Sequence, residues 1–133
     1  MQKNEIILSV DKAADGTATD VAYVRHEEHL NRSLYIGPLH TLSANDTLGL
    51  YRTRPTPSGN HRGVAKARTK LTRDIVVPGV DQSTTRTSPA IFEDSFAVPV
   101  GMTREQFIEL LQTKIALLQD PEVIERLCLQ LSI

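Results

Sequence analysis

The sequence has few of the residues on which several classes of protein depend. It holds one cysteine, Cys128, so no disulfide can form within the chain. It has no tryptophan, and aromatic residues make up only 5 % of it, which argues against an aromatic cage or a large aromatic core. No apolar run reaches about 18 residues, so we expect neither a membrane-spanning segment nor a membrane partner. The glycines stand apart from one another, which excludes a glycine-rich phosphate loop.

The overall composition is that of one ordinary globular domain. The 133 residues are 40 % hydrophobic and 23 % charged, with a formal net charge of -1. A chain of this length predicts a single domain over residues 1–133. The net charge by itself gives no argument for a polyanionic partner, so any such argument depends on where the charges lie.

Sites for catalysis or metal binding are not evident. His26 and His29 flank two glutamates, but their spacing is not that of the His-Glu-x-x-His metal motif and no further pair of ligands is apparent. Glu93 and Asp94 are adjacent, so on a strand they point to opposite sides and cannot act as a pair. We expect no catalytic residues, no metal site, no cofactor and no small-molecule substrate. A metal protein centred on the two histidines stays the least favoured alternative.

The pattern of elements predicts an α+β protein. Apolar runs at residues 6–10 and 21–24 around Asp15-Gly16 predict an N-terminal β-hairpin. Further strands are expected at residues 33–36, 47–54, 62–77 and 90–98, with a polar, mobile loop at residues 81–88. The chain therefore holds six or seven strands, and the fold we expect is an N-terminal β-hairpin with a five-stranded antiparallel sheet. Because strands come first and helices last, a parallel α/β fold is excluded.

Two helices are expected at the C-terminal end. Thr103 and Gln106 form a capping box at the start of the first helix, and Asp120-Pro121 starts the second. Apolar residues at helical spacing give both helices wide apolar stripes, and the chain ends in a leucine-rich segment. Two helices cover only part of such a sheet, so we expect a two-fold homodimer in which the helices of each copy lie across the sheet of the other.

Basic residues gather in one part of the chain. Residues 47–73 contain no acidic residue but seven basic ones, namely Arg52, Arg54, Arg62, Lys66, Arg68, Lys70 and Arg73. In the strand at 62–77, alternation places five side chains on one face, namely Arg62, Val64, Lys66, Arg68 and Lys70. Such a row of cations suits a polyphosphate such as RNA, or else it is a solvated edge that blocks aggregation.

Two placements stay open at this stage. Strand pairing could add Arg52 and Arg54 to the cationic surface, but Leu48 and Leu50 would then face the same way unless a bulge intervenes. In the last strand, Asp94 lies on an otherwise apolar side and needs a partner. Arg104 and the N-terminus of the first helix are the candidates.

The order of the elements resembles that of the coat proteins of small single-stranded RNA bacteriophages, the levivirus group. Residues 103–127, TREQFIELLQTKIALLQDPEVIERL, are similar to that family's pair of C-terminal helices, and residues 52–77 to its central hairpin. The resemblance implies an interlocked homodimer that assembles into an icosahedral shell. It also implies that the sheet face binds genomic RNA and a stem-loop whose binding represses translation of the replicase gene. The protein would then occur in the virion and, before assembly, in the cytoplasm of the bacterial host.

The resemblance also implies positions for RNA contacts. They fall on Lys66, flanked by Arg62, Val64 and Arg68, and on Arg52, Glu93 and Ser95. The family's base-stacking tyrosine falls on Ile91, which cannot stack, and Tyr51 is a candidate substitute. The segment at 77–88 is similar to the family's loop around the symmetry axes. The alternative function is that of a dimeric nucleic-acid-binding regulator that forms no shell.

Overall fold

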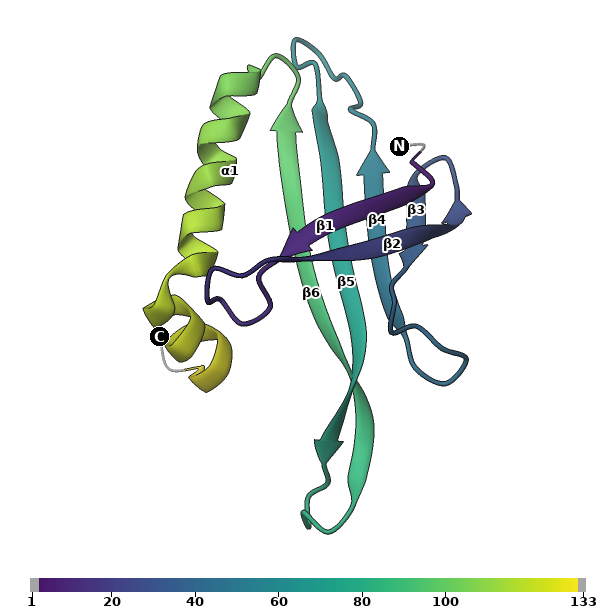
Figure 1. Ribbon diagram of the computed structural model, residues 1–133. Coiled ribbons are helices and arrows are strands. Elements are labelled where there is room, and N and C mark those ends of the chain that lie inside the picture. Colours follow the sequence, from purple (N-terminus) through teal and green to yellow (C-terminus); the bar gives the residue numbers. More distant parts are fainter. Residues whose placement is uncertain (1–2, 132–133) are drawn as a thin grey trace.

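The computed structural model describes residues 3–131 and consists of one antiparallel sheet followed by two helices (Figure 1). The predicted α+β class is therefore confirmed. The six strands lie in sequence order, and their bounds are β1 (Glu5–Val10), β2 (Thr19–Glu28), β3 (Arg32–Ile36), β4 (Asp46–Thr53), β5 (Val64–Pro78) and β6 (Thr85–Pro99). The helices are α1 (Arg104–Gln119) and η1 (Val123–Gln130), a π-helix. Neither helix is both long and apolar enough to cross a membrane.

The N-terminal hairpin belongs to the same sheet as the other strands. The expectation of a hairpin beside a separate five-stranded sheet is wrong, because β2 is ten residues long and pairs with β1 on one side and β3 on the other. The pairing of β2 with β3 shifts register between Arg25 and Glu27. Such a bulge bends a strand, and Figure 1 shows β1 and β2 crossing in front of β4, β5 and β6.

The core lies where this hairpin crosses the sheet. Its buried apolar residues are Val21 and Tyr23 from β2, Tyr35 from β3 and Leu48 from β4. The Tyr35 ring is completely buried, and its hydroxyl donates a hydrogen bond of 2.8 Å to the backbone oxygen of Lys3. This core fixes one face of the sheet as the covered one, which we call the apolar face.

The turn between β4 and β5 forms at the predicted Pro and Gly cluster. Ser58 and His61 make an isolated bridge, and Gly59 between them has a φ of 60°. Gly63 has a φ of 93°, and a Cβ there would lie 2.8 Å from backbone atoms of Thr56. A side chain at position 63 is excluded by both conditions.

The last two strands extend past the rest of the sheet as a two-stranded arm (Figure 1). In the arm, Asp74–Pro78 pairs with Thr85–Pro89, beyond the end of β4. The predicted loop at 81–88 and the predicted strand start at Ala90 are therefore wrong, because the connection spans only residues 79–84. The β5 half of the arm falls within the predicted strand at 62–77, whereas the β6 half, Thr85–Pro89, is polar and exposed and so lacks the apolar alternation that would mark a strand in the sequence.

The first helix begins directly after its predicted cap, Thr103, and the helical residues 121–122 that follow Asp120 lead into η1. The Thr103 side chain accepts a hydrogen bond from the Gln106 backbone, and the Gln106 side chain accepts one from the Thr103 backbone. Asp120 likewise accepts bonds from the backbone of Glu122 and Val123. These bonds satisfy N–H groups that have no partner within their helices.

The first helix meets the sheet along β6 and on the apolar face. The Phe96 and Phe107 rings lie 6.0 Å apart, and the Lys114 Nζ is 3.4 Å from the Asp94 carboxylate. The partner of Asp94 is thus Lys114, three turns into the helix, and neither of the two candidates at its start. The helix runs alongside β6 (Figure 1), so a residue inside α1 reaches the middle of that strand.

Candidate nucleic-acid interface

The strand register gathers cations on the face of the sheet opposite the apolar face. Directly opposed residues of antiparallel strands share a face, and Lys66, Arg68 and Lys70 of β5 oppose Ala97, Ser95 and Glu93 of β6. On the other side of β5 they oppose Thr53, Tyr51 and Gly49 of β4. We call this surface the cationic face. Its charged residues on β3 to β6 are Arg32, Lys66, Arg68, Lys70, Asp74 and Glu93, and Glu27 of β2 adjoins them opposite Leu34.

Arg32 is a member of this face that the sequence reasoning missed. It opposes Tyr51 across the β3–β4 pairing, so Arg32, Tyr51, Arg68 and Ser95 form one row across four strands. The sequence carries no signal for this, because Arg32 lies outside the basic segment and joins it only through strand pairing.

The cationic face is left open by the rest of the described chain. The hairpin packs through Tyr23 on Tyr35 and Leu48, which lie on the apolar face. The contacts of α1 with Asp94 and Phe96 are on that face as well. Within residues 3–131, no element therefore stands between the cationic face and solvent.

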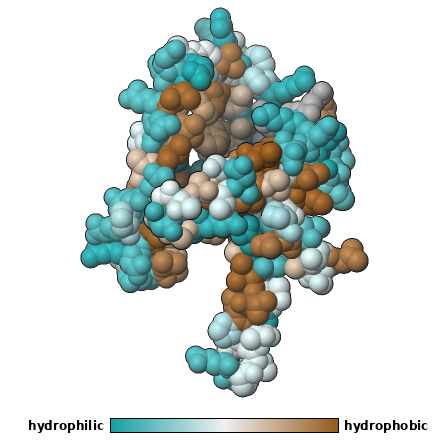
Figure 2. Space-filling model, in the orientation of Figure 1, coloured by the Kyte–Doolittle hydropathy of each residue, from teal (hydrophilic) through white to brown (hydrophobic). Residues whose placement is uncertain are grey.

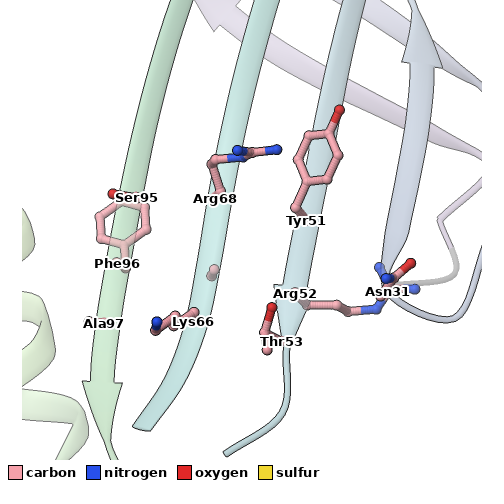
Figure 3. Close-up of a pocket in the computed structure, with 10 residues that line it drawn as sticks. Asn31, Tyr51, Arg52, Thr53, Lys66, Arg68, Ser95, Phe96 and Ala97 are labelled. Atoms are coloured by element: carbon pink, nitrogen blue, oxygen red, sulfur yellow. The ribbon is translucent and has the colours of Figure 1, made fainter.

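Ion pairing leaves most of these cations uncompensated. Arg68 Nη1 lies 3.2 Å from the Glu93 carboxylate, and its Cζ lies 4.3 Å from the centre of the Tyr51 ring (Figure 3). Among residues 3–131, no carboxylate lies within salt-bridge distance of the other three cations, Arg32, Lys66 and Lys70. Open cations without an ion-pair partner attract polyanions, and RNA phosphates are neutralised by such side chains.

Arg52 does not join the cationic face. It opposes Ala67, and it lies on the same side as Leu48 and Leu50, because β4 pairs with β5 without a register shift. Its guanidinium donates to the backbone oxygens of Leu30 and His29, to the Ser33 hydroxyl and to the Glu28 carboxylate. The expectation that pairing adds Arg52 to the cationic row is therefore wrong, and its contacts tie the β2–β3 connection to β4.

Two partners of the Glu28 carboxylate change its pKa. The Ser33 hydroxyl and the Arg52 guanidinium lower the pKa of Glu28 below its ordinary value. Arg73 is the other basic residue that turns away, and its Nε lies 3.4 Å from the carboxylate of Asp46, which is buried.

The remaining predicted RNA contacts lie on or beside the cationic face. Val64 begins β5 and is half-buried, whereas Arg54 and Arg62 are exposed in the connection between β4 and β5. Glu93 and Ser95 lie on the face itself, opposite Lys70 and Arg68. Ile91 also lies there, opposite Thr72, with 51 % of its surface exposed.

The histidine cluster is open and loosely arranged. The Nε2 atoms of His26 and His29 lie 3.9 and 3.3 Å from carboxylate oxygens of Glu27. Across the described residues, no three His, Cys, Asp or Glu side chains are placed to hold a metal ion. Cys128 is exposed on η1 and makes no disulfide.

Comparison with known proteins gives matches at the level of structure. No protein-family model matches the chain, and no curated protein matches it by sequence. The virus-like particle of bacteriophage AVE019 matches with a TM-score of 0.75 at 20 % identity, over 100 % of this chain and 99 % of the other. That of Wenzhou levi-like virus 4 matches with a TM-score of 0.74 at 19 % identity, over 98 % and 88 %.

A third solved particle is also similar to this chain. The virus-like particle of Beihai levi-like virus 32 is 24 % identical, with a TM-score of 0.65, and the match covers 78 % of this chain and 83 % of the other. At these identities the likeness concerns the fold, and the first two matches span nearly the whole of this chain. The chain therefore has the fold of the levi-like virus-like-particle proteins, which is the fold that its resemblance to levivirus coat proteins implies.

Proposed function

We propose that this chain is a phage coat protein that pairs into interlocked dimers, assembles into an icosahedral shell and packages single-stranded RNA. The observation that carries the proposal is a sheet with one open cationic face and one incompletely covered apolar face, in a fold shared with levi-like particles. The cationic face lines the inside of the shell, and the helices lie outside. The protein is structural, resides in the virion, and is made in the cytoplasm of the bacterial host.

The exposed area of a single chain supports association. The chain alone exposes 10533 Å², whereas a compact monomer of its mass exposes about 7,000 Å². A permanent dimer interface buries roughly 1,000–2,500 Å² on each partner. The excess of about 3,500 Å² is therefore enough for a dimer and for further contacts between dimers.

The places where apolar groups are exposed indicate how the dimer forms. Phe92, on the apolar face of β6, is 73 % exposed, and none of the described residues of α1 or η1 is buried. Figure 2 shows apolar side chains on α1 and in the hollow between α1 and the hairpin. β6 is also an edge strand of 15 residues. Pairing of β6 with its copy covers this edge, and the partner's helices fill the hollow.

The RNA stem-loop of the replicase gene is the second proposed ligand, and it binds on the same face. Ile91 lies on that face at the position implied for base stacking, and its side chain is aliphatic. We infer that stem-loop binding relies on other residues of the cationic face.

Expression of this chain alone tests the proposal. We expect closed particles of uniform size in electron micrographs, with RNA inside. Dimers that bind RNA but never form particles would favour the regulator without a shell. A stable monomer in gel filtration would overturn both functions.

Charge reversal on the cationic face tests the role in packaging. We expect Lys66→Glu with Lys70→Glu to leave dimers intact and to reduce the RNA content of particles below about half, because only phosphate contacts are lost. The measurement is the ratio of nucleic-acid to protein absorbance in purified particles. The control is Arg86→Glu with Arg104→Glu, which changes the charge equally but lies away from that face and from the hollow at Phe92. Equal RNA loss in both variants would contradict the placement of the RNA.

A further inference from the structure

The four histidines of the chain fall into two pairs with different surroundings. His40 and His61 each accept a hydrogen bond at Nδ1 from a backbone N–H, at 3.3 and 3.0 Å. These two rings therefore help to fold the connections on either side of β4. The other pair, His26 and His29, lies at the end of β2 and contacts a side chain instead.

That side chain is Glu27, whose carboxylate joins the two rings of the histidine cluster. Its oxygens lie within 3.9 Å of Nε2 of both His26 and His29. The two histidine side chains are 56 % and 50 % exposed. Solvent, protons and ligands therefore reach both rings without any movement of the fold.

Strand pairing brings the histidine cluster to the edge of the cationic face. Glu27 opposes Leu34, and the same row continues across β4 to Lys70. The backbone N–H of His29 donates a hydrogen bond of 2.8 Å to the backbone oxygen of Arg32, so His29 stands opposite a cation of that face. A polyanion that lies on Arg32 therefore also meets the histidine cluster.

The charge of the cationic face is close to balanced, so a small change has a large effect. With Glu27 it holds four cations and three carboxylates, namely Arg32, Lys66, Arg68, Lys70, Glu27, Asp74 and Glu93. Histidine is the side chain whose ordinary pKa makes its charge change between about pH 5 and 8. The cations exceed the carboxylates by one, and protonation of both rings triples that excess.

The other charged groups around the histidine cluster belong to classes that titrate outside this range. They lie on β2, β3, β4 and the segment that pairs with β2, and they are Arg25, Glu28, Arg32, Arg52, Lys3 and Glu5. The Ser33 hydroxyl and the Arg52 guanidinium lower the pKa of Glu28, which keeps that carboxylate ionised. A change in charge at this edge therefore comes from the two rings.

We propose that the histidine cluster makes RNA binding by the cationic face pH-dependent, with tighter binding at about pH 6 than at about pH 8. With neutral rings, the cluster carries only the negative charge of Glu27, which repels phosphates at this edge. With protonated rings, two imidazolium groups outweigh Glu27 and, together with Arg32, bind phosphates of the strand. This inference rests on the proposed RNA-binding role of the cationic face and assigns its regulation to residues outside the basic segment.

Binding of a fluorescently labelled oligouridylate to the purified full chain tests the histidine cluster, because uracil bases keep their charge over this range. We expect the wild type to bind about tenfold more tightly at the lower pH, with a slope of log affinity against log salt that is steeper by about 1.4. The variant with His26→Gln and His29→Gln should bind equally at both pH values, as the wild type does at the higher one. Glu27→Gln should bind more tightly than the wild type at the higher pH and keep the pH response.

The matched control is His40→Gln, which removes a histidine away from this edge and should keep the wild-type pH response. Thermal melting at both pH values identifies any loss that comes from unfolding. Equal wild-type affinity and salt slope at the two pH values, or a full pH response in the folded double variant, would overturn the inference and leave the RNA face intact. Failure of the wild type to bind at either pH would overturn the RNA role of the face as well.

Discussion

Arg52 shows how the position of a single side chain decides its use. It belongs to the same basic segment as Lys66 and Arg68, yet it lies on the opposite face because it opposes Ala67. There its guanidinium makes four hydrogen bonds, which join β4 to the connection between β2 and β3. Alternation along one strand shows which of its side chains share a face. It does not show which face of the neighbouring strand they join, so it cannot place Arg52 relative to Lys66 and Arg68.

The Arg52 contacts lead to a prediction about stability. Arg52→Lys keeps the charge but cannot reproduce donation to four acceptors from one planar group. We expect the free energy of unfolding to fall by roughly 1–3 kcal/mol, measured by urea or thermal denaturation. The control is Arg54→Lys, at an exposed position just after β4, which should change stability by less than about 0.5 kcal/mol. Equal effects of the two substitutions would show that the Arg52 network adds little.

At the scale of elements, local chemistry sets the starts of the helices. The capping box at Thr103 and the cap at Asp120 depend on residues within three positions of each other, so the sequence contains all that is needed to predict them. The β5–β6 arm is the opposite case. Its two strands pair with each other but pack on no other element of the described chain, and the polar β6 half, Thr85–Pro89, is ordered by backbone bonds that no side-chain period reveals.

The tip of the arm is held by a single carboxylate. Asp81 accepts hydrogen bonds from the Thr84 hydroxyl and from the backbone of Ser83 and Thr84. The side-chain bonds from Thr84 and Ser83 lower the pKa of Asp81 below its ordinary value. The arm therefore ends in a closed turn, 79–84, in place of the longer loop that the sequence predicts.

The first helix cap gives the prediction at this scale. Thr103→Ala removes the hydroxyl that accepts the hydrogen bond from the Gln106 backbone, and only the bond from the residue 103 backbone to the Gln106 side chain is left. We expect the free energy of unfolding to fall by about 1 kcal/mol. Circular dichroism during thermal unfolding measures it. Thr113→Ala, in the exposed middle of the same helix, is the control and should be neutral or slightly stabilising. A loss in Thr113→Ala as large as that in Thr103→Ala would argue against the capping role.

For the whole molecule, the main question is what covers the apolar face. The hairpin covers one part of it and the start of α1 another, which leaves Leu71 and Phe92 exposed between them. The chain alone has four buried apolar residues among those described, a small core for its size. In the proposed shell, we therefore expect contacts between copies to supply a large part of the stability.

A charge on this face tests the dimer. We expect Phe92→Asp to prevent dimer formation, because the partner's helices would bury an unpaired carboxylate. Light scattering after gel filtration and electron microscopy measure the outcome, and particles should be absent. Leu42→Asp, in the exposed loop between β3 and β4, should assemble normally. Normal particles from Phe92→Asp would exclude this face from the dimer interface.

The sequence by itself determined whatever depends on near neighbours. The helix caps, the turn at 55–60 and the common face of Lys66, Arg68 and Lys70 follow from spacings of two to four residues. Only the tertiary structure decided which strand lies beside which. Pairing of β3 with β4 and of β4 with β5 brings Arg32 and Tyr51 to the cationic face and turns Arg52 away. Register between distant strands depends on packing across the whole sheet, which no local period contains.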